Sequence, residues 1–302
     1  MNINGVEIED TFAEAFKMRA ARLIVTAVNQ RWALTAAQVA TGFATSVIAC
    51  SGEAGIEGEI PADETPDGRP GVSILVFTMG AKGMEDQLMR RVGQCVMTCP
   101  TTACFNGLES DERVKVGGSL RYFGDGFQIS KLFPPGVGGA RRRFWRIPVM
   151  EGEFLIEEGF GIKKAIGGGN FLILGESSQA TLEAAEQAVE AMRKVRGVVM
   201  PFPGGIVRSG SKTTSRYKFL HASTNTAYCP TIRRQTESAL PEGVNSVLEI
   251  VIDGLDEWAI REAMRVGIRA ACRPGVVRIS AGNYGGTLGQ YQFHLREIVG
   301  AG

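Results

Sequence analysis

The chain has 302 residues, more than a single domain usually contains, and this length predicts two domains or lobes. Its 33 lysines and arginines balance 32 acidic residues, so the net charge of +1 argues against a nucleic-acid-binding module, which would carry a clear basic excess. No run of about 18 apolar residues occurs, and the acidic N-terminus does not resemble a signal peptide, so we expect no membrane span and a cytoplasmic protein.

Apolar residues spaced by three or four predict amphipathic helices in four regions. In chain order these are Ala36–Thr41 with its flanks, Gly83–Cys95, Ala180–Arg196 and Leu255–Cys272. Ser177 or Ser178 can cap the third helix, and Gly197 can end it. Runs rich in Val, Ile and Phe between glycines or prolines predict strands at 72–78, 143–148, 170–174, 205–208, 246–252 and 276–280.

The polar segment 109–139 contains repeated glycines and the pair Pro134-Pro135. We interpret it as an excursion from the first lobe that could bind a partner. A plain surface loop is the commoner structure for such a segment and stays as the alternative.

One internal repeat is visible in the second half of the chain. The repeat is a predicted helix followed by a glycine turn, two valines and a glycine pair. The valines and glycines are Val198-Val199 with Gly204-Gly205, and about 80 residues later Val276-Val277 with Gly285-Gly286. Repeated split β-α-β units explain this pattern, and they predict an α+β protein with two lobes that meet near residues 145–160.

Cofactor signatures are absent from the sequence. The 6 cysteines form no Cys-x-x-Cys pair and only 2 histidines are present, so we expect no metal site. The glycine loops at 201–205 and 280–286 match neither the dinucleotide-binding motif nor the phosphate-binding loop. They would let a ligand approach the backbone closely, with Asn283 as a polar contact, or they could simply be tight turns.

Glu249 is the most suggestive single residue. Within 246–252 it alternates with Leu248 and Ile250, so it shares a face with Val247 and Val251. On a central strand its carboxyl group would lose water, and its pKa would rise towards neutrality, as suits an acid catalyst. On an edge strand it would merely face solvent.

Three polar clusters have less specific patterns. Ser223-Thr224-Asn225 could orient a pterin ring or form a turn, and Glu151 or Glu153 could enter a cleft but more often such acids are solvated. The run Arg141-Arg142-Arg143 could bind an anion or lie in a solvated loop.

Several stretches together resemble the formylmethanofuran:tetrahydromethanopterin formyltransferase family, and they follow one another across nearly the whole chain. They are NGVEIEDTFAEAF at 4–16, ETPDGRPG at 64–71, GQCV at 93–96, PFPGGIV at 201–207, ASTN at 222–225, LPEGV at 240–244 and AGNYGG at 281–286.

This resemblance implies two ferredoxin-like lobes, 1–148 and 149–302, a homotetramer and no prosthetic group. It implies that the formyl group passes directly between two coenzyme substrates, methanofuran and tetrahydromethanopterin, in a ternary complex. The family's protonated catalytic glutamate matches Glu249. The expected substrate-binding residues are Pro203, Gly204, Gly205, Ser223, Thr224, Asn225, Asn283, Tyr284, Arg141 and Arg142.

The region Arg113–Arg146 departs from the archaeal pattern and resembles the methylotrophic-bacterial branch, in which the chain is a subunit of a formyltransferase/hydrolase complex. There the basic run could bind the polyglutamate tail of methanofuran. A catalytically silent scaffold, or a pterin-binding subunit of a one-carbon enzyme complex, is the alternative function. The presence of Glu249 favours the active enzyme.

Overall fold

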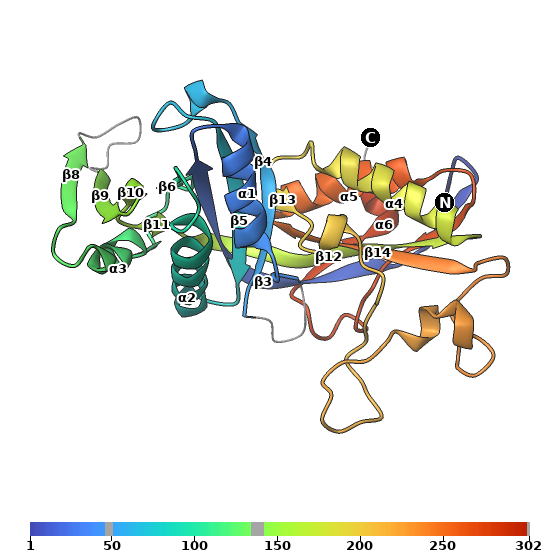
Figure 1. The fold of residues 1–302 in the computed structure, drawn as a ribbon. Coiled ribbons are helices and arrows are strands. Elements are labelled where there is room, and N and C mark those ends of the chain that lie inside the picture. The colour runs from blue at the N-terminus through green and yellow to red at the C-terminus, as the bar shows by residue number, and fades with distance from the viewer. Residues whose placement is uncertain (46–50, 134–141, 301–302) are drawn as a thin grey trace. The chain divides into compact units, whose positions relative to one another are not determined.

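The computed structural model describes residues 1–45, 51–133 and 142–300, which form two compact units (Figure 1). The N-terminal unit comprises Met18–Thr45 and 51–165, and the C-terminal unit comprises Met1–Lys17 and 166–300. This division differs from the predicted lobes 1–148 and 149–302, because Met1–Lys17 packs with the C-terminal part of the chain. These units are defined by contacts in space, and the lobe boundary along the chain, near residue 148, stays a prediction.

The N-terminal unit contains a four-stranded antiparallel sheet with strand order β4-β5-β3-β6. Its elements are β3 (Phe12–Thr26), α1 (Gln30–Thr41), β4 (Glu53–Ile60), η1 (Ala62–Glu64), β5 (Gly71–Thr78), α2 (Ala81–Arg91), the π-helical turn η2 (Val92–Val96) and β6 (Ala103–Asn106). The Asn29 side chain caps α1 by accepting the Trp32 N–H at 3.1 Å. The two predicted helices of this region are thus present, the second as α2 and η2.

The segment 109–139 is regular structure over its described part, 109–133, so a plain loop does not describe it. It contributes β7 (Arg113–Val114), α3 (Gly117–Leu120), η3 (Arg121–Gly124) and β8 (Ile129–Phe133). After it come β9 (Arg142–Val149), β10 (Gly152–Glu157) and β11 (Phe160–Gly161). Strands β8, β9 and β10 pair in antiparallel order, and β10 joins β6 in parallel.

The C-terminal unit repeats the strand order of the N-terminal sheet, as β13-β14-β12-β15, again antiparallel. Its elements are β12 (Lys163–Gly175), α4 (Ser178–Met192), β13 (Val198–Val199), β14 (Ser246–Gly254), α5 (Glu257–Ala271) and β15 (Val276–Ser280). Figure 1 shows α4 and α5 on one face of this sheet, where Phe171, Ile250 and Ile268 belong to one buried core.

Further short elements complete the C-terminal unit. They are β1 (Asn2–Ile3), β2 (Val6–Ile8), β16 (Tyr291–His294), α6 (Leu295–Gly300) and the 3-10 turns η4 (Pro203–Gly205), η5 (Thr226–Tyr228) and η6 (Pro230–Ile232). Strand β2 pairs with β15, and β16 pairs with the start of β3. No helix among the described residues is long and apolar enough to cross a membrane.

The internal repeat corresponds to two successive helix–strand connections of this one unit, α4 to β13 and α5 to β15. The Ser177 hydroxyl caps α4 as predicted, and Gly197 follows the helix at a φ of +84°. The predicted strand 205–208 is wrong. Gly204 and Gly205 have φ values of +66° and +85°, so the chain turns here, and only Val207 pairs with β14.

Candidate active site

Glu249 lies inside a sheet and not at its edge. Strand β12 pairs with β14 on one side, where Leu172 is directly opposite Glu249. On the other side Val207 and Glu249 exchange backbone hydrogen bonds of 2.7 and 3.0 Å. The edge-strand alternative is therefore wrong. Because Ile250 and Ile252 point into the core under α4 and α5, Glu249 points to the opposite face of the sheet.

The Glu249 side chain is half-buried in the sheet. Its pKa rises from 4.5 to about 7 because burial penalises the charged form. Among the described residues, none makes a hydrogen bond or an ion pair with this carboxyl group. A carboxyl group of this kind is substantially protonated near neutral pH, and it can donate a hydrogen bond or a proton to a bound ligand.

An apolar cluster on the same face accounts for this burial. Leu172 and Leu174 on β12 pack with Val244, and Tyr228 and Leu240 from the preceding segment contact the cluster. Across the sheet Leu172 is also opposite Ser280 on β15, whose hydroxyl lies 3.2 Å from the Tyr228 hydroxyl. The segment that carries η5 and η6 thus packs beside the strand that carries Glu249.

Tyr284 belongs to the loop 281–290, which we call the Tyr284 loop. Burial raises the pKa of the Tyr284 hydroxyl, and the negative charges of Glu249 and Glu14 raise it further. The loop begins just after Ser280, which lies across Leu172 from Glu249 in the sheet, so the chain enters the Tyr284 loop from the sheet face that carries Glu249. Asn283 instead uses its side-chain amide within the fold, where it donates to the Thr11 hydroxyl and the Phe12 carbonyl.

The Pro203–Gly205 turn lies close in sequence to Val207, the backbone partner of Glu249. Pro203 and Gly204 are exposed, and space is open where a Gly204 side chain would be. Gly205 is buried, and a Cβ atom there would lie 3.1 Å from the Val189 methyl groups. Gly204 thus leaves the backbone accessible to a ligand, whereas Gly205 serves close packing against α4.

Ser223 lies in a β-bridge with Lys212, Thr224 follows it, and Asn225 begins the 3-10 turn η5. Ser223 pairs with Lys212 through two backbone hydrogen bonds, and its hydroxyl donates to the Thr214 carbonyl at 2.5 Å. The Thr224 hydroxyl lies 3.2 Å from the Cys229 sulfur, and the Asn225 carbonyl accepts the Tyr228 N–H. The turn alternative is thus present in the structure, and contact of these residues with a pterin stays a prediction.

Arg142 lies in the N-terminal unit, and its guanidinium is paired with a buried carboxylate. It donates to Glu157 at 3.0 and 2.5 Å, and these hydrogen bonds raise the pKa of Arg142 although partial burial opposes them. Arg143 and Arg146 likewise pair with Glu158 and Glu153. Arg141 lies outside the described residues. Anion binding by this run stays a prediction.

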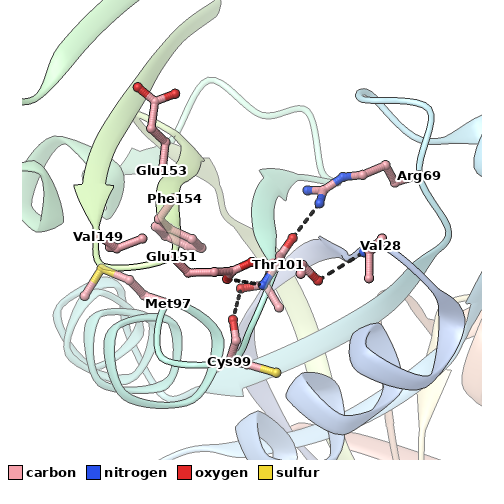
Figure 2. Close-up of a pocket in the computed structure, with 10 residues that line it drawn as sticks. Val28, Arg69, Met97, Cys99, Thr101, Val149, Glu151, Glu153 and Phe154 are labelled. Atoms are coloured by element: carbon pink, nitrogen blue, oxygen red, sulfur yellow. Dashed lines mark hydrogen bonds between the residues drawn. The ribbon is translucent and has the colours of Figure 1, made fainter.

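A cavity of about 300 Å³ lies in the N-terminal unit, lined by Val28, Arg69, Met97, Cys99, Thr101, Thr102, Val149, Glu151, Glu153 and Phe154 (Figure 2). Glu151 accepts the Thr101 N–H at 2.7 Å, and Arg69 donates to the Thr101 carbonyl at 2.5 Å. These contacts hold Thr101 at a left-handed φ of +66°. Glu151 therefore reaches a cleft, but its described hydrogen bond supports the backbone.

Nucleophilic or metal-dependent chemistry finds little support in the part of the chain that the structure describes. Burial, with a smaller contribution from Glu151, raises the pKa of the Cys99 thiol, which disfavours the reactive thiolate. No group of three or more His, Cys, Asp or Glu side chains among these residues could hold a metal ion.

Glu14 is the residue that the sequence analysis missed. It lies in the quoted segment 4–16, yet its side chain is only 1% exposed and accepts hydrogen bonds from the backbone of the Tyr284 loop. The signal that could have found it is a single acidic residue between Ala13 and Ala15, with Phe12 and Phe16 on either side.

Comparison with known proteins gives one consistent family. A family model described as formylmethanofuran-tetrahydromethanopterin formyltransferase matches residues 1–149, and the model of its proximal lobe matches residues 152–298. A relative from Methylococcus capsulatus, named formylmethanofuran–tetrahydromethanopterin formyltransferase, is 61% identical over 303 residues, covering 99% of this chain and 100% of the relative.

Two solved structures are similar over the whole chain. The formylmethanofuran:tetrahydromethanopterin formyltransferase from Methanosarcina barkeri is 52% identical with a TM-score of 0.92, and 99% of this chain and 100% of that chain are covered. A chain of the formyltransferase/hydrolase complex from Methylorubrum extorquens, solved with methylofuran, is 53% identical with a TM-score of 0.95, covering 99% and 98%. The chain therefore belongs to the formylmethanofuran–tetrahydromethanopterin formyltransferase family, whose members are transferases.

Proposed function

We propose that this protein transfers a formyl group between the amine of formylmethanofuran and N5 of tetrahydromethanopterin. The observation that carries the proposal is Glu249, a half-buried carboxyl group beside an apolar cluster with a pKa of about 7, in a chain that matches the family over nearly its full length. Both coenzymes are substrates in this reaction, and no prosthetic group is needed.

The proposed chemistry is a direct transfer in a ternary complex. The N5 lone pair attacks the formyl carbon, and the carbonyl electrons move to oxygen to give a tetrahedral oxyanion. Protonated Glu249 donates a hydrogen bond to this oxygen. The carbonyl then re-forms, the bond to the methanofuran nitrogen breaks, and the proton lost from N5 balances the proton that this nitrogen gains. Alignment of the two substrates supplies much of the rate enhancement.

The strand orders support a further structural proposal. Each unit contains a β-α-β-β-α-β succession in which the first strand lies between the third and the fourth, as β4-β5-β3-β6 and as β13-β14-β12-β15. We propose that both units are variants of the ferredoxin-like fold. We also propose that the chain assembles as a homotetramer, alone or within a formyltransferase/hydrolase complex like that of its Methylorubrum relative.

Formyl transfer from formylmethanofuran to tetrahydromethanopterin by the purified protein tests the proposal, with Glu249→Gln measured in parallel. We expect the variant to lose about 100-fold in kcat, as expected for removal of an oxyanion donor. The exposed Glu297→Gln is the matched control. An active Glu249→Gln would remove Glu249 from the chemistry. A folded but inactive wild type, tested with its native partners, would favour the silent scaffold, which the enzyme names of the relatives do not favour.

A further inference from the structure

The Glu14 carboxylate accepts hydrogen bonds from the backbone of the Tyr284 loop. One oxygen accepts the Tyr284 and Gly286 N–H groups at 2.7 and 3.0 Å. The other accepts the N–H groups of Leu288, at 2.6 Å, and of Gly289. Among the described residues, no Lys, Arg or His forms an ion pair with Glu14.

A buried carboxylate without a cation needs strong hydrogen bonds to stay charged. Burial raises the pKa of Glu14, but the four backbone N–H donors outweigh it and hold the pKa below its ordinary value. The charged carboxylate of Glu14 therefore holds the backbone of the Tyr284 loop in one conformation. The backbone N–H of Glu14 also donates to the Gly282 carbonyl, so the strand binds the loop twice.

The loop has separate anchors along its length. Asn170 on β12 binds Gly282 through both its oxygen, at 2.6 Å, and its nitrogen, at 3.0 Å, and so holds the beginning of the loop. Glu14 holds the stretch from Tyr284 to Gly289. Two residues farther along β3, the Phe16 ring lies 6.1 Å from the Tyr284 ring. Glu14 and Phe16 thus place Tyr284 in a loop that begins just after Ser280, the residue across Leu172 from Glu249 in the sheet.

We propose that Glu14 is a positioning residue of formyl transfer, whose carboxylate fixes the Tyr284 loop over the sheet face that carries Glu249. This inference rests on the proposed function. Glu14 reaches the reaction only through the loop backbone. Release of the loop admits water to Glu249, and a more hydrated carboxyl group is protonated to a smaller extent near neutral pH.

Glu14→Gln is the direct test, with Glu297→Gln as the control. The amide group offers one acceptor oxygen, and its NH₂ group would face backbone N–H donors. Hydrogen–deuterium exchange should become faster at Tyr284, Gly286, Leu288 and Gly289 and stay unchanged at Gly282, which Asn170 still holds. We expect kcat to fall about 10- to 100-fold, KM for both substrates to stay within about threefold, and the alkaline midpoint of kcat to move to lower pH.

Gly289→Ala attacks the same contact from the loop side, because an added Cβ would lie 2.6 Å from both the Ala15 carbonyl oxygen and Glu14 Cγ. It should reproduce the faster amide exchange, the lower kcat and the shifted alkaline midpoint. Glu14→Asp should restore part of kcat relative to Glu14→Gln. Unchanged amide exchange, or faster exchange with unchanged kcat and midpoint, would overturn the positioning role. A wild type without formyl transfer would instead overturn the proposed function, whatever the exchange measurement gives.

Discussion

Glu249 and Leu172 face each other across the β12–β14 ladder, and Leu172 is only 4% exposed. A carboxyl group directly beside a buried leucine cannot keep its full hydration, which accounts for its raised pKa.

Glu249→Gln should stabilise the protein at pH 8 and leave its stability nearly unchanged at pH 4. The folded-state pKa of Glu249 is raised from 4.5 to about 7. The stability that this group contributes is therefore fully present below about pH 4.5 and is lost as the pH rises through about 7. The loss at pH 8 is at most about 3 kcal/mol, and the amide does not suffer it. Urea unfolding at the two pH values measures this. Equal stability of variant and wild type at pH 8 would contradict the buried, uncompensated carboxyl group.

Leu172→Ala should lower the pKa of Glu249, because water can enter beside the carboxyl group. The alkaline limb of kcat should move to lower pH, and the free energy of unfolding should fall by about 2–4 kcal/mol because of the cavity. Leu174→Ala is the matched control, since Leu174 is fully buried in the same cluster but lies opposite Val247. A pH–rate profile that shifts equally in both variants would mean that Leu172 has no specific effect on Glu249.

Much of the fold near Glu249 could be predicted from sequence, because strand alternation and helix periodicity are local. The alternation around Glu249 predicts that Ile250 and Glu249 lie on opposite faces, and the structure shows that the face of Ile250 is the core face. Two features could not be predicted. Strand β3 has charged residues such as Lys17 and Arg19 along an otherwise apolar run, so its 15 residues do not alternate simply. The contact of Glu14 with the Tyr284 loop joins residues about 270 positions apart, which no local pattern reveals.

The arginine run shows the same limit. Sequence places Arg142 beside other cations, but the pairing of β9 with β10 brings carboxylates against them. Arg142, Arg143 and Arg146 form ion pairs with Glu157, Glu158 and Glu153, respectively. A cluster that looks basic along the chain is thus largely neutralised in space. Register, and therefore this neutralisation, depends on which strands become neighbours.

Arg142→Met should destabilise the protein without changing formyl transfer by the folded enzyme. The buried Glu157 would lose the two hydrogen bonds of 3.0 and 2.5 Å from Arg142. Among the described residues it would keep those from Arg113 and the Asn106 N–H. We expect a loss of about 2 kcal/mol in the free energy of unfolding. Chemical unfolding and KM for formylmethanofuran should be measured together. A raised KM with unchanged stability would instead assign Arg142 to binding of an anionic substrate group.

Gly197→Ala should cost about 1–2 kcal/mol through the backbone alone. Gly197 has a φ of +84°, and the nearest atoms to an added Cβ would lie at 3.6 Å or beyond, which is ordinary contact. The cost is therefore that of the left-handed conformation in the turn between α4 and β13. Gly58→Ala is the matched control, because nothing lies within 4 Å of its Cβ position and its φ is not left-handed. It should change stability by less than about 0.5 kcal/mol. Thermal unfolding of both variants measures the difference, and equal melting temperatures would show that the α4 turn tolerates a side chain.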